Sequence, residues 1–129
     1  MIAQASDVVI DWARFAQARS QLGSNFVRVI GYFREDGVKS VNAIEDGMRA
    51  LNPVAMVGPA DLLKMDAMQI GALSVAELAE DVEFAARDCI EWHQSPEALI
   101  ENVVQLRVAL EGTLEQLDRE VSPLVARRA

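Results

Sequence analysis

The sequence predicts an all-α protein, an antiparallel up-and-down four-helix bundle with a short additional helix at its N-terminus. Three observations lead to this prediction. Apolar residues recur at a period of about 3.5–3.6 through four segments, short connections join these segments, and no segment alternates apolar and polar residues for long enough to be a strand. The composition agrees, because 51% of the residues are hydrophobic but only 5% are aromatic, which favours packed helices over a β-sandwich.

The first two predicted helices occupy the first part of the chain. One runs from about Asp7 to Leu22, and Gly23 ends it, as glycine commonly does. The next spans about 25–51 and carries a near-heptad apolar row. Gly37 lies close to the line of that row, where its missing side chain lets a neighbouring helix approach. The two apolar rows are Val9, Trp12, Phe15 and Ala16, and then Phe26, Ile30, Phe33, Val41, Ile44, Met48 and Leu51.

A central helix follows over about residues 58–70. Asn52 and Pro53 form a helix-start signal. Pro59 lacks an amide proton and clashes with the preceding turn, so we expect a kink or a fresh beginning there. Gly71 closes the helix. The buried face of this helix is predicted to comprise Leu63, Ala67 and Ile70, with Leu62 beside them.

Two further helices complete the predicted bundle. Ser74 and Glu77 match a capping box that opens the fourth helix, and Ser95 with Pro96 is a start signal for the last one. Pro123 is expected to stop the last helix. The apolar rows are Leu78, Val82, Ala85, Cys89 and Trp92 in the fourth helix, and Leu99, Val103, Leu106, Leu110, Leu114 and Leu117 in the last.

Length and charge bound what the chain can be. Its 129 residues are predicted to form a single domain, 1–129, with an ordered core of about 7–121. Twelve basic against twenty acidic residues give a net charge of −8, which argues against nucleic acid and against an anionic membrane surface as partners. No signal peptide and no apolar run long enough to span a membrane is readable, and the single cysteine fits a reducing compartment. We therefore expect a cytoplasmic protein.

The opposite face of the central helix is the most informative surface. Asp61, Lys64, Met65 and Met68 share it, at i, i+3, i+4 and i+7 spacing. One acid, one base and two methionines are unusual for a face that meets only water, and exposed methionine is typical of adaptable docking surfaces. The alternative is that the helix is rotated and both methionines belong to the core.

This stretch resembles the central helix of the histidine-phosphotransfer (Hpt) domain family. The family motif runs His-x-Leu-Lys-Gly, then Asn or Gln, and one residue on, Gly-Ala. Here Leu63 and Lys64 match, and Gln69, Gly71 and Ala72 match at the right offsets. The resemblance covers about residues 10–120, and it implies a four-helix bundle with a short leading helix in which Leu63, Gln69, Gly71 and Ala72 have structural roles.

Two positions depart from the family motif. Asp61 stands where the family has its phospho-accepting histidine, and Met65 stands where it has glycine. A neutral imidazole offers a nitrogen lone pair to a phosphoryl group at cellular pH, whereas a carboxylate repels the phosphoryl oxygens. The resemblance therefore implies a non-enzymatic adaptor of a two-component phosphorelay, without a catalytic residue. Its partner would be a response-regulator receiver domain or a histidine kinase, docked through Asp61, Lys64, Met65 and Met68.

Other functions stay open at this stage. An active phosphocarrier would have to use Asp61 or His93, the only histidine, which we expect to be a helix-end residue. Cys89 is expected in the core, and Trp12 and Trp92 are expected to be packing residues. No cofactor and no metal is expected, because a lone histidine is no metal site. A structural or oligomerising bundle, including a homodimer through the methionines, is the remaining alternative.

Overall fold

The computed structural model describes residues 8–128, and the side chains of residues 8–120. All the regular secondary structure of the described chain is helical and none of it is strand, so the predicted all-α class is confirmed. The elements are α1 (Trp12–Leu22), a 3-10 turn η2 (Gly23–Asn25), α2 (Phe26–Arg49), α3 (Val54–Ile70), α4 (Leu73–Glu91), a 3-10 turn η3 (Pro96–Leu99) and α5 (Ile100–Arg128).

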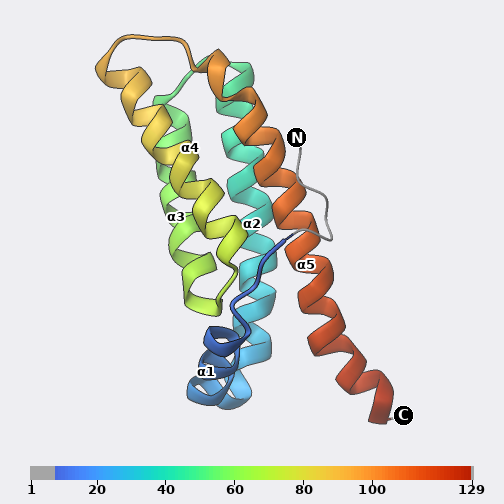
Figure 1. Cartoon of the computed structure of the whole chain (residues 1–129). Coiled ribbons are helices and arrows are strands. Elements are labelled where there is room, and N and C mark those ends of the chain that lie inside the picture. The colour runs from blue at the N-terminus through green and yellow to red at the C-terminus, as the bar shows by residue number, and fades with distance from the viewer. Residues whose placement is uncertain (1–7, 129) are drawn as a thin grey trace.

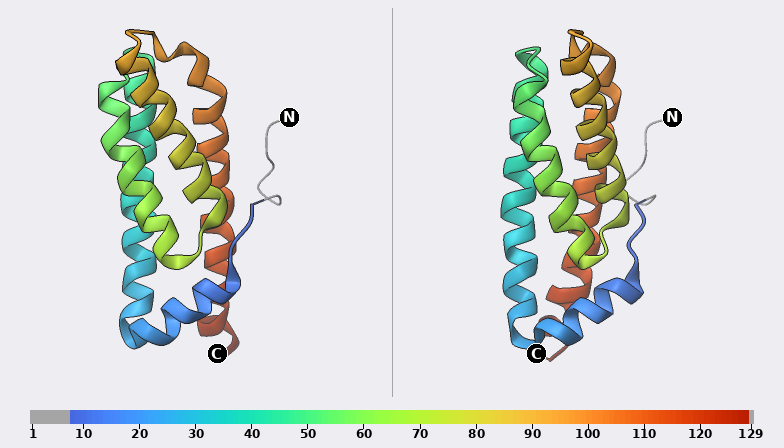
Figure 2. Two further views of the ribbon diagram at one scale, coloured as in Figure 1. Left: turned by 60° about the vertical axis from the view of Figure 1, so that its left-hand side comes forward. Right: turned by 90° about the vertical axis from the view of Figure 1, so that its left-hand side faces the viewer.

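Four long helices, α2 to α5, pack together around one apolar core. Successive helices run in opposite directions, and α1 lies across the end of the molecule where α3 turns into α4 (Figures 1 and 2). The short connections predicted from the sequence produce this arrangement, because a short loop returns the chain alongside the helix it has just left. No helix in the described part of the chain is long and apolar enough to cross a membrane.

The predicted apolar rows are mostly buried, but three of them are partly wrong. In α1 the buried residues are Phe15 and Ala18, whereas Val9, Trp12 and Ala16 of the predicted row are exposed. In α2 and α5 the rows hold, with the exception of Leu51, which is exposed beyond the end of α2. In α4 the buried face is turned relative to the prediction, so that Trp92 is exposed and Leu78 and Ala85 are only half-buried. Small side chains let α4 lie close to α3, and they therefore face inward. The buried residues of α4 are Val75, Ala76, Ala79, Val82, Glu83, Ala86 and Cys89.

The N-terminal boundaries differ from the prediction because the chain makes a tertiary contact there. Asp11 is the N-cap of α1, its carboxylate accepting the Arg14 amide at 3.0 Å, so α1 begins at Trp12; Asp7 lies outside the described residues. Val9, in the extended segment before this cap, donates its N–H to Ser74 Oγ at 2.7 Å and accepts the Ser74 N–H at 3.1 Å. Ser74 therefore lies inside the first turn of α4, and the predicted capping box is not formed.

The two prolines expected to interrupt or end helices do neither. α3 begins at Val54 and continues through Pro59, so the fresh beginning predicted at Pro59, as the alternative to a kink, is wrong. Likewise α5 continues through Pro123 to Arg128.

Three helices end in the same backbone motif. Leu51, Gly71 and His93 each follow a helix with a positive φ (53°, 81° and 52°). In each case the next residue donates its N–H back into the last turn: Asn52 to Gly47, Ala72 to Ala67 and Gln94 to Cys89, at 2.8–2.9 Å. This is the Schellman arrangement, which satisfies carbonyl groups that would otherwise lack a partner.

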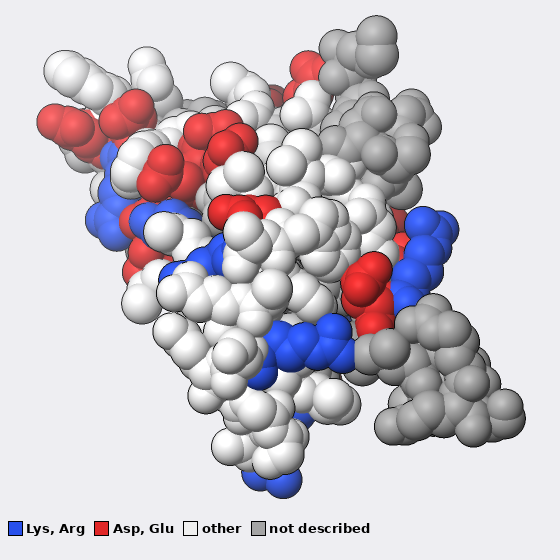
Figure 3. All heavy atoms as spheres, turned by 60° about the horizontal axis from the view of Figure 1, so that its bottom comes forward, with Lys and Arg blue, Asp and Glu red and all other residues white. Residues whose placement is uncertain are grey.

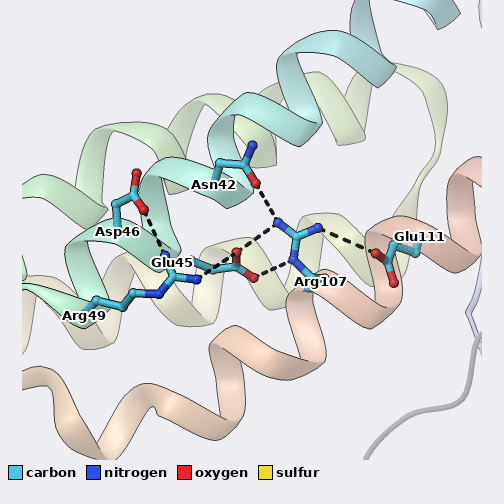
Figure 4. A network of polar contacts seen from close by, with 6 residues as sticks. All are labelled: Asn42, Glu45, Asp46, Arg49, Arg107 and Glu111. Atoms are coloured by element: carbon cyan, nitrogen blue, oxygen red, sulfur yellow. Dashed lines mark hydrogen bonds and ion pairs between the residues drawn. The ribbon is translucent and has the colours of Figure 1, made fainter.

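Two contacts fix α5 against α2. A Cβ added to Gly37 would lie 3.1 Å from Leu110 Cδ1, so the predicted close approach of a neighbouring helix at this glycine is confirmed. On the outer side of the same interface Arg107 bridges the helices by hydrogen bonds to Glu45 and Asn42 (Figure 4). The charge-assisted, two-pronged Arg107–Glu45 pair sets the register of the two helices.

Candidate functional site

The rotation of α3 places the predicted face outward. Met65 and Met68 are 60% and 57% exposed, and the Asp61 side chain is 44% exposed, whereas Leu63 and Ala67 are completely buried. The alternative in which both methionines belong to the core is therefore excluded. We call Asp61, Lys64, Met65 and Met68 the docking face.

Lys64 is the least exposed member of the docking face. Its side chain is only 17% exposed, and its ammonium lies 2.8 Å from Glu83 Oε1 and 3.4 Å from Asp61 Oδ1. The ammonium also lies 5.6 Å from the centre of the Phe84 ring, within the range of a cation–π contact. Lys64 thus bridges α3 to α4 and does not extend into solvent.

Glu83 contacts the docking face through Lys64 and was not among the residues singled out from the sequence. Its side chain is only 5% exposed, and its second oxygen accepts hydrogen bonds from Arg87 Nε at 3.2 Å and Arg87 Nη2 at 3.0 Å. The signal in the sequence was an acid beside Val82 in a buried row, with an arginine four residues later. Asp61, Lys64, Glu83 and Arg87 form an ionic quartet of two acids and two bases, whose formal charges cancel.

These contacts determine the charge states of Lys64 and Glu83. The hydrogen bond from Lys64 lowers the pKa of Glu83 below its ordinary value of 4.5, with a further contribution from Arg87, although burial acts in the opposite direction. The pKa of Lys64 is raised above 10.5, mainly because its ammonium donates to Glu83. Both groups are therefore charged throughout the physiological range.

Glu83 should make stability depend on acidity. Because its pKa is lower in the folded than in the unfolded chain, its contribution is fully present above pH 4.5 and is lost as the pH falls through the folded-state pKa. We expect Glu83→Gln to lower the free energy of unfolding at neutral pH, and the difference from wild type to shrink below pH 4.5. Urea unfolding at several pH values measures this. Glu80→Gln, an exposed acid one turn earlier in α4, is the matched control, and a pH-independent difference for Glu83→Gln would contradict the assignment.

An apolar hollow adjoins the docking face at the α1 end of the molecule. Its volume is about 490 Å³, and its apolar lining residues include Met65, Met68, Leu73 and Ala76. Asp11, Arg14, Gln69 and Gly71 complete its wall. Uncharged side chains cover most of this end of the molecule, and acidic side chains gather toward one edge (Figure 3). The two methionines thus line one hollow together with Leu73 and Ala76 and are not isolated exposed residues.

The residues assigned structural roles by the motif occupy distinct positions. Leu63 is in the core, and Gln69 is exposed at the edge of the hollow. Gly71 ends α3 in the left-handed conformation, and its carbonyl accepts the Asp11 N–H at 2.8 Å. Ala72 is completely buried at the start of α4. The Gly-Ala pair thus forms the tight α3–α4 turn on which the N-terminal segment packs.

The remaining candidates lie apart from the docking face. His93 is exposed after the C-terminal end of α4, whereas Leu73 at the other end of that helix lines the hollow. Cys89 is buried, as predicted, with its sulfur 3.7 Å from the Ser95 carbonyl oxygen. Trp92 is exposed, so its predicted packing role is wrong. Among the described residues no group of three or more His, Cys, Asp or Glu side chains could hold a metal ion.

The comparisons with known proteins add no relative. No protein-family model, curated protein or solved structure is significantly similar to the chain. A functional assignment therefore has to rest on the motif residues and on the geometry of α3 and α4.

Proposed function

We propose that this protein is an Hpt-like adaptor of two-component signalling in the cytoplasm. It docks a receiver domain of a response regulator, or a histidine kinase, through Asp61, Lys64, Met65 and Met68, and it passes no phosphoryl group. The observation that carries this proposal is the outward position of Asp61, Met65 and Met68 on one face of α3. Asp61 and Met65 stand at the offsets at which the Hpt motif has its histidine and glycine.

The chemistry of position 61 supports an adaptor over a phosphocarrier. A carboxylate there would have to form an acyl phosphate, which requires a cation to offset the charge of the incoming phosphoryl oxygens. The nearest cation, Lys64, is already bound to Glu83 and Asp61. Met65 further occupies the space that glycine leaves open in the family motif. The same site that cannot accept a phosphoryl group still presents a methionine surface suited to binding.

The apolar surface beside Asp61 supplies the affinity in this proposal. Met65 and Met68 continue into the hollow formed with Leu73 and Ala76, so a partner can bury a contiguous apolar area. Asp61 stands at the edge of that area with its carboxylate half-exposed. It can therefore face the metal-binding pocket of a receiver domain, where the cation would attract it.

The proposal is tested by measuring binding of purified receiver domains from the same genome, for example by calorimetry. We expect at least one receiver to bind, and Met65→Glu and Asp61→Arg each to weaken that binding by about 30-fold or more, as expected for a central interface residue. Leu62→Glu is the matched control. Leu62 is equally exposed on α3 but lines a separate hollow with Lys39 and Ser40.

Two results would contradict the proposal. Retention of binding in both the Met65→Glu and the Asp61→Arg variant would show that the partner uses another surface. Equal loss with Leu62→Glu would show that the effect reflects a general disturbance of α3 and not a loss of contacts at the docking face.

A further inference from the structure

We propose that the docking face selects the unphosphorylated state of its receiver partner, and that Glu83 determines this selectivity by withholding the charge of Lys64. The inference rests on the proposed function, and it adds which state of the partner is bound. It makes the protein a sensor of receiver domains that have not yet accepted a phosphoryl group.

The first step is the charge balance of the face. Lys64 donates to Glu83 at 2.8 Å and lies 3.4 Å from Asp61, so two carboxylates surround its single positive charge. Arg87, the other cation of the quartet, is held by the second oxygen of Glu83 through two hydrogen bonds. Lys64, the one cation among the four residues of the docking face, is therefore already paired.

The second step is the position of Asp61. Its side chain is 44% exposed, and its contact with Lys64 is the longer of the two that this ammonium makes. The outermost charge of the docking face is therefore negative. A partner anion brought against this face meets the carboxylate before it meets the Lys64 ammonium, because the Lys64 side chain is only 17% exposed. Arg87 is 56% exposed, but it lies on α4 and is not a member of the docking face.

The third step is the charge of the partner. A phosphoryl group on the receiver's aspartate replaces one negative charge by about two and adds three acceptor oxygens. At contact distances near a protein surface, a pair of like charges costs enough to change an affinity by a factor of ten or more. Because Glu83 already pairs with Lys64, the one cation among the residues of the docking face, this cost is not offset within the face. The face therefore binds the unphosphorylated receiver more tightly.

The experiment measures the dissociation constant of one receiver domain in two states. The receiver is the one identified in the binding test above, and the second state is that receiver with Mg²⁺ and beryllofluoride, which mimics the phosphoryl group. Mg²⁺ is present in both measurements. We expect the beryllofluoride-loaded receiver to bind about tenfold more weakly.

Three variants assign the selectivity to particular residues. Glu83→Gln removes the closer of the two carboxylates around Lys64 and gives the quartet a net positive charge, so the affinity ratio between the two receiver states should fall toward one. Asp61→Asn removes the outermost carboxylate and leaves the Lys64–Glu83 pair in place. It should by itself bring the affinity ratio between the two receiver states closer to one. Glu80→Gln, an equal change of charge on α4 outside the quartet, should leave the ratio unchanged. Thermal unfolding by circular dichroism shows whether each variant is folded.

Each outcome decides between the hypotheses. Weaker binding of the loaded receiver, with a narrower ratio in Asp61→Asn and in a folded Glu83→Gln, supports the inference. Equal or tighter binding of the beryllofluoride-loaded receiver overturns the inference and leaves the adaptor function intact. An affinity ratio that Asp61→Asn does not change has the same meaning. Failure of every receiver to bind in either state overturns the proposed function itself.

Discussion

Replacing Gly71 by alanine is expected to destabilise the protein by about 3 kcal/mol, more than a typical point substitution. Two costs add at this position. Gly71 has φ +81°, a left-handed conformation that costs a residue with a side chain about 1–2 kcal/mol. The added methyl group would also lie 2.5 Å from the Asp11 carbonyl oxygen and 3.1 Å from Arg14 Cβ.

The second cost at Gly71 cannot be relieved by a rotamer change, because the nearest atom belongs to the backbone. The start of α1 would have to move away from the α3–α4 turn. That movement would break the hydrogen bond from the Asp11 N–H to the Gly71 carbonyl. The same movement would pull on the pairing of Val9 with Ser74. One methyl group therefore disturbs the docking of the whole N-terminal segment.

Urea unfolding measured against a matched glycine tests this explanation. Gly58 is also in α3, but a Cβ there would meet nothing within 4 Å, and its φ is not positive. Gly58→Ala should be neutral or stabilise the helix by up to about 1 kcal/mol. If Gly71→Ala changes the free energy of unfolding no more than Gly58→Ala does, the close packing of Asp11 on the α3–α4 turn is wrong.

Truncating Leu63 is expected to have an effect of similar size, about 3 kcal/mol. Its side chain is completely buried between α2 and α3, where Cδ1 lies 3.7 Å from the position of a Gly37 Cβ. Leu63→Ala removes buried methyl groups and leaves a cavity, which together cost about 2–5 kcal/mol in well-packed cores. The measurement is the free energy of unfolding from urea denaturation at constant pH.

The adjacent leucine makes this a test of how α3 is rotated. Leu62 is 50% exposed, so Leu62→Ala should cost well under 1 kcal/mol. A helix rotated to bury Met65 and Met68 would raise the cost of the methionine truncations and lower that of Leu63. If Leu62→Ala and Leu63→Ala lower the free energy of unfolding by similar amounts, α3 is not rotated as described. The outward docking face, on which the proposed function depends, would then be wrong.

Much of the fold follows from patterns that are local in the sequence. The row from Phe26 to Met48 and the row from Leu99 to Leu117 are buried as predicted, because a helical period in apolar residues fixes which side of a helix avoids water. Gly37 was recognised as a point of close approach for the same reason. Leu51 and Trp92 were misassigned because each period was extended past the residue at which the helix ends.

The candidate site was only partly readable in this way. The motif offsets placed Asp61, Met65 and Met68 on one face of the central helix, and that face is exposed. They gave no reason to expect that Lys64 would be drawn out of solvent. Its partner Glu83 lies nineteen residues away on another helix. No spacing rule within one helix can identify such a pair.

The sequence by itself determined the all-helical class and the net negative charge, and it favoured an outward face on the central helix, because composition and period act within each segment. Only the tertiary structure decided the rotation of α4, the burial of Glu83 against Lys64 and the docking of the N-terminal segment on Gly71. These features depend on how far one helix is turned and shifted against the next. Side chains from all the packed helices set that geometry together, and a single segment does not contain it.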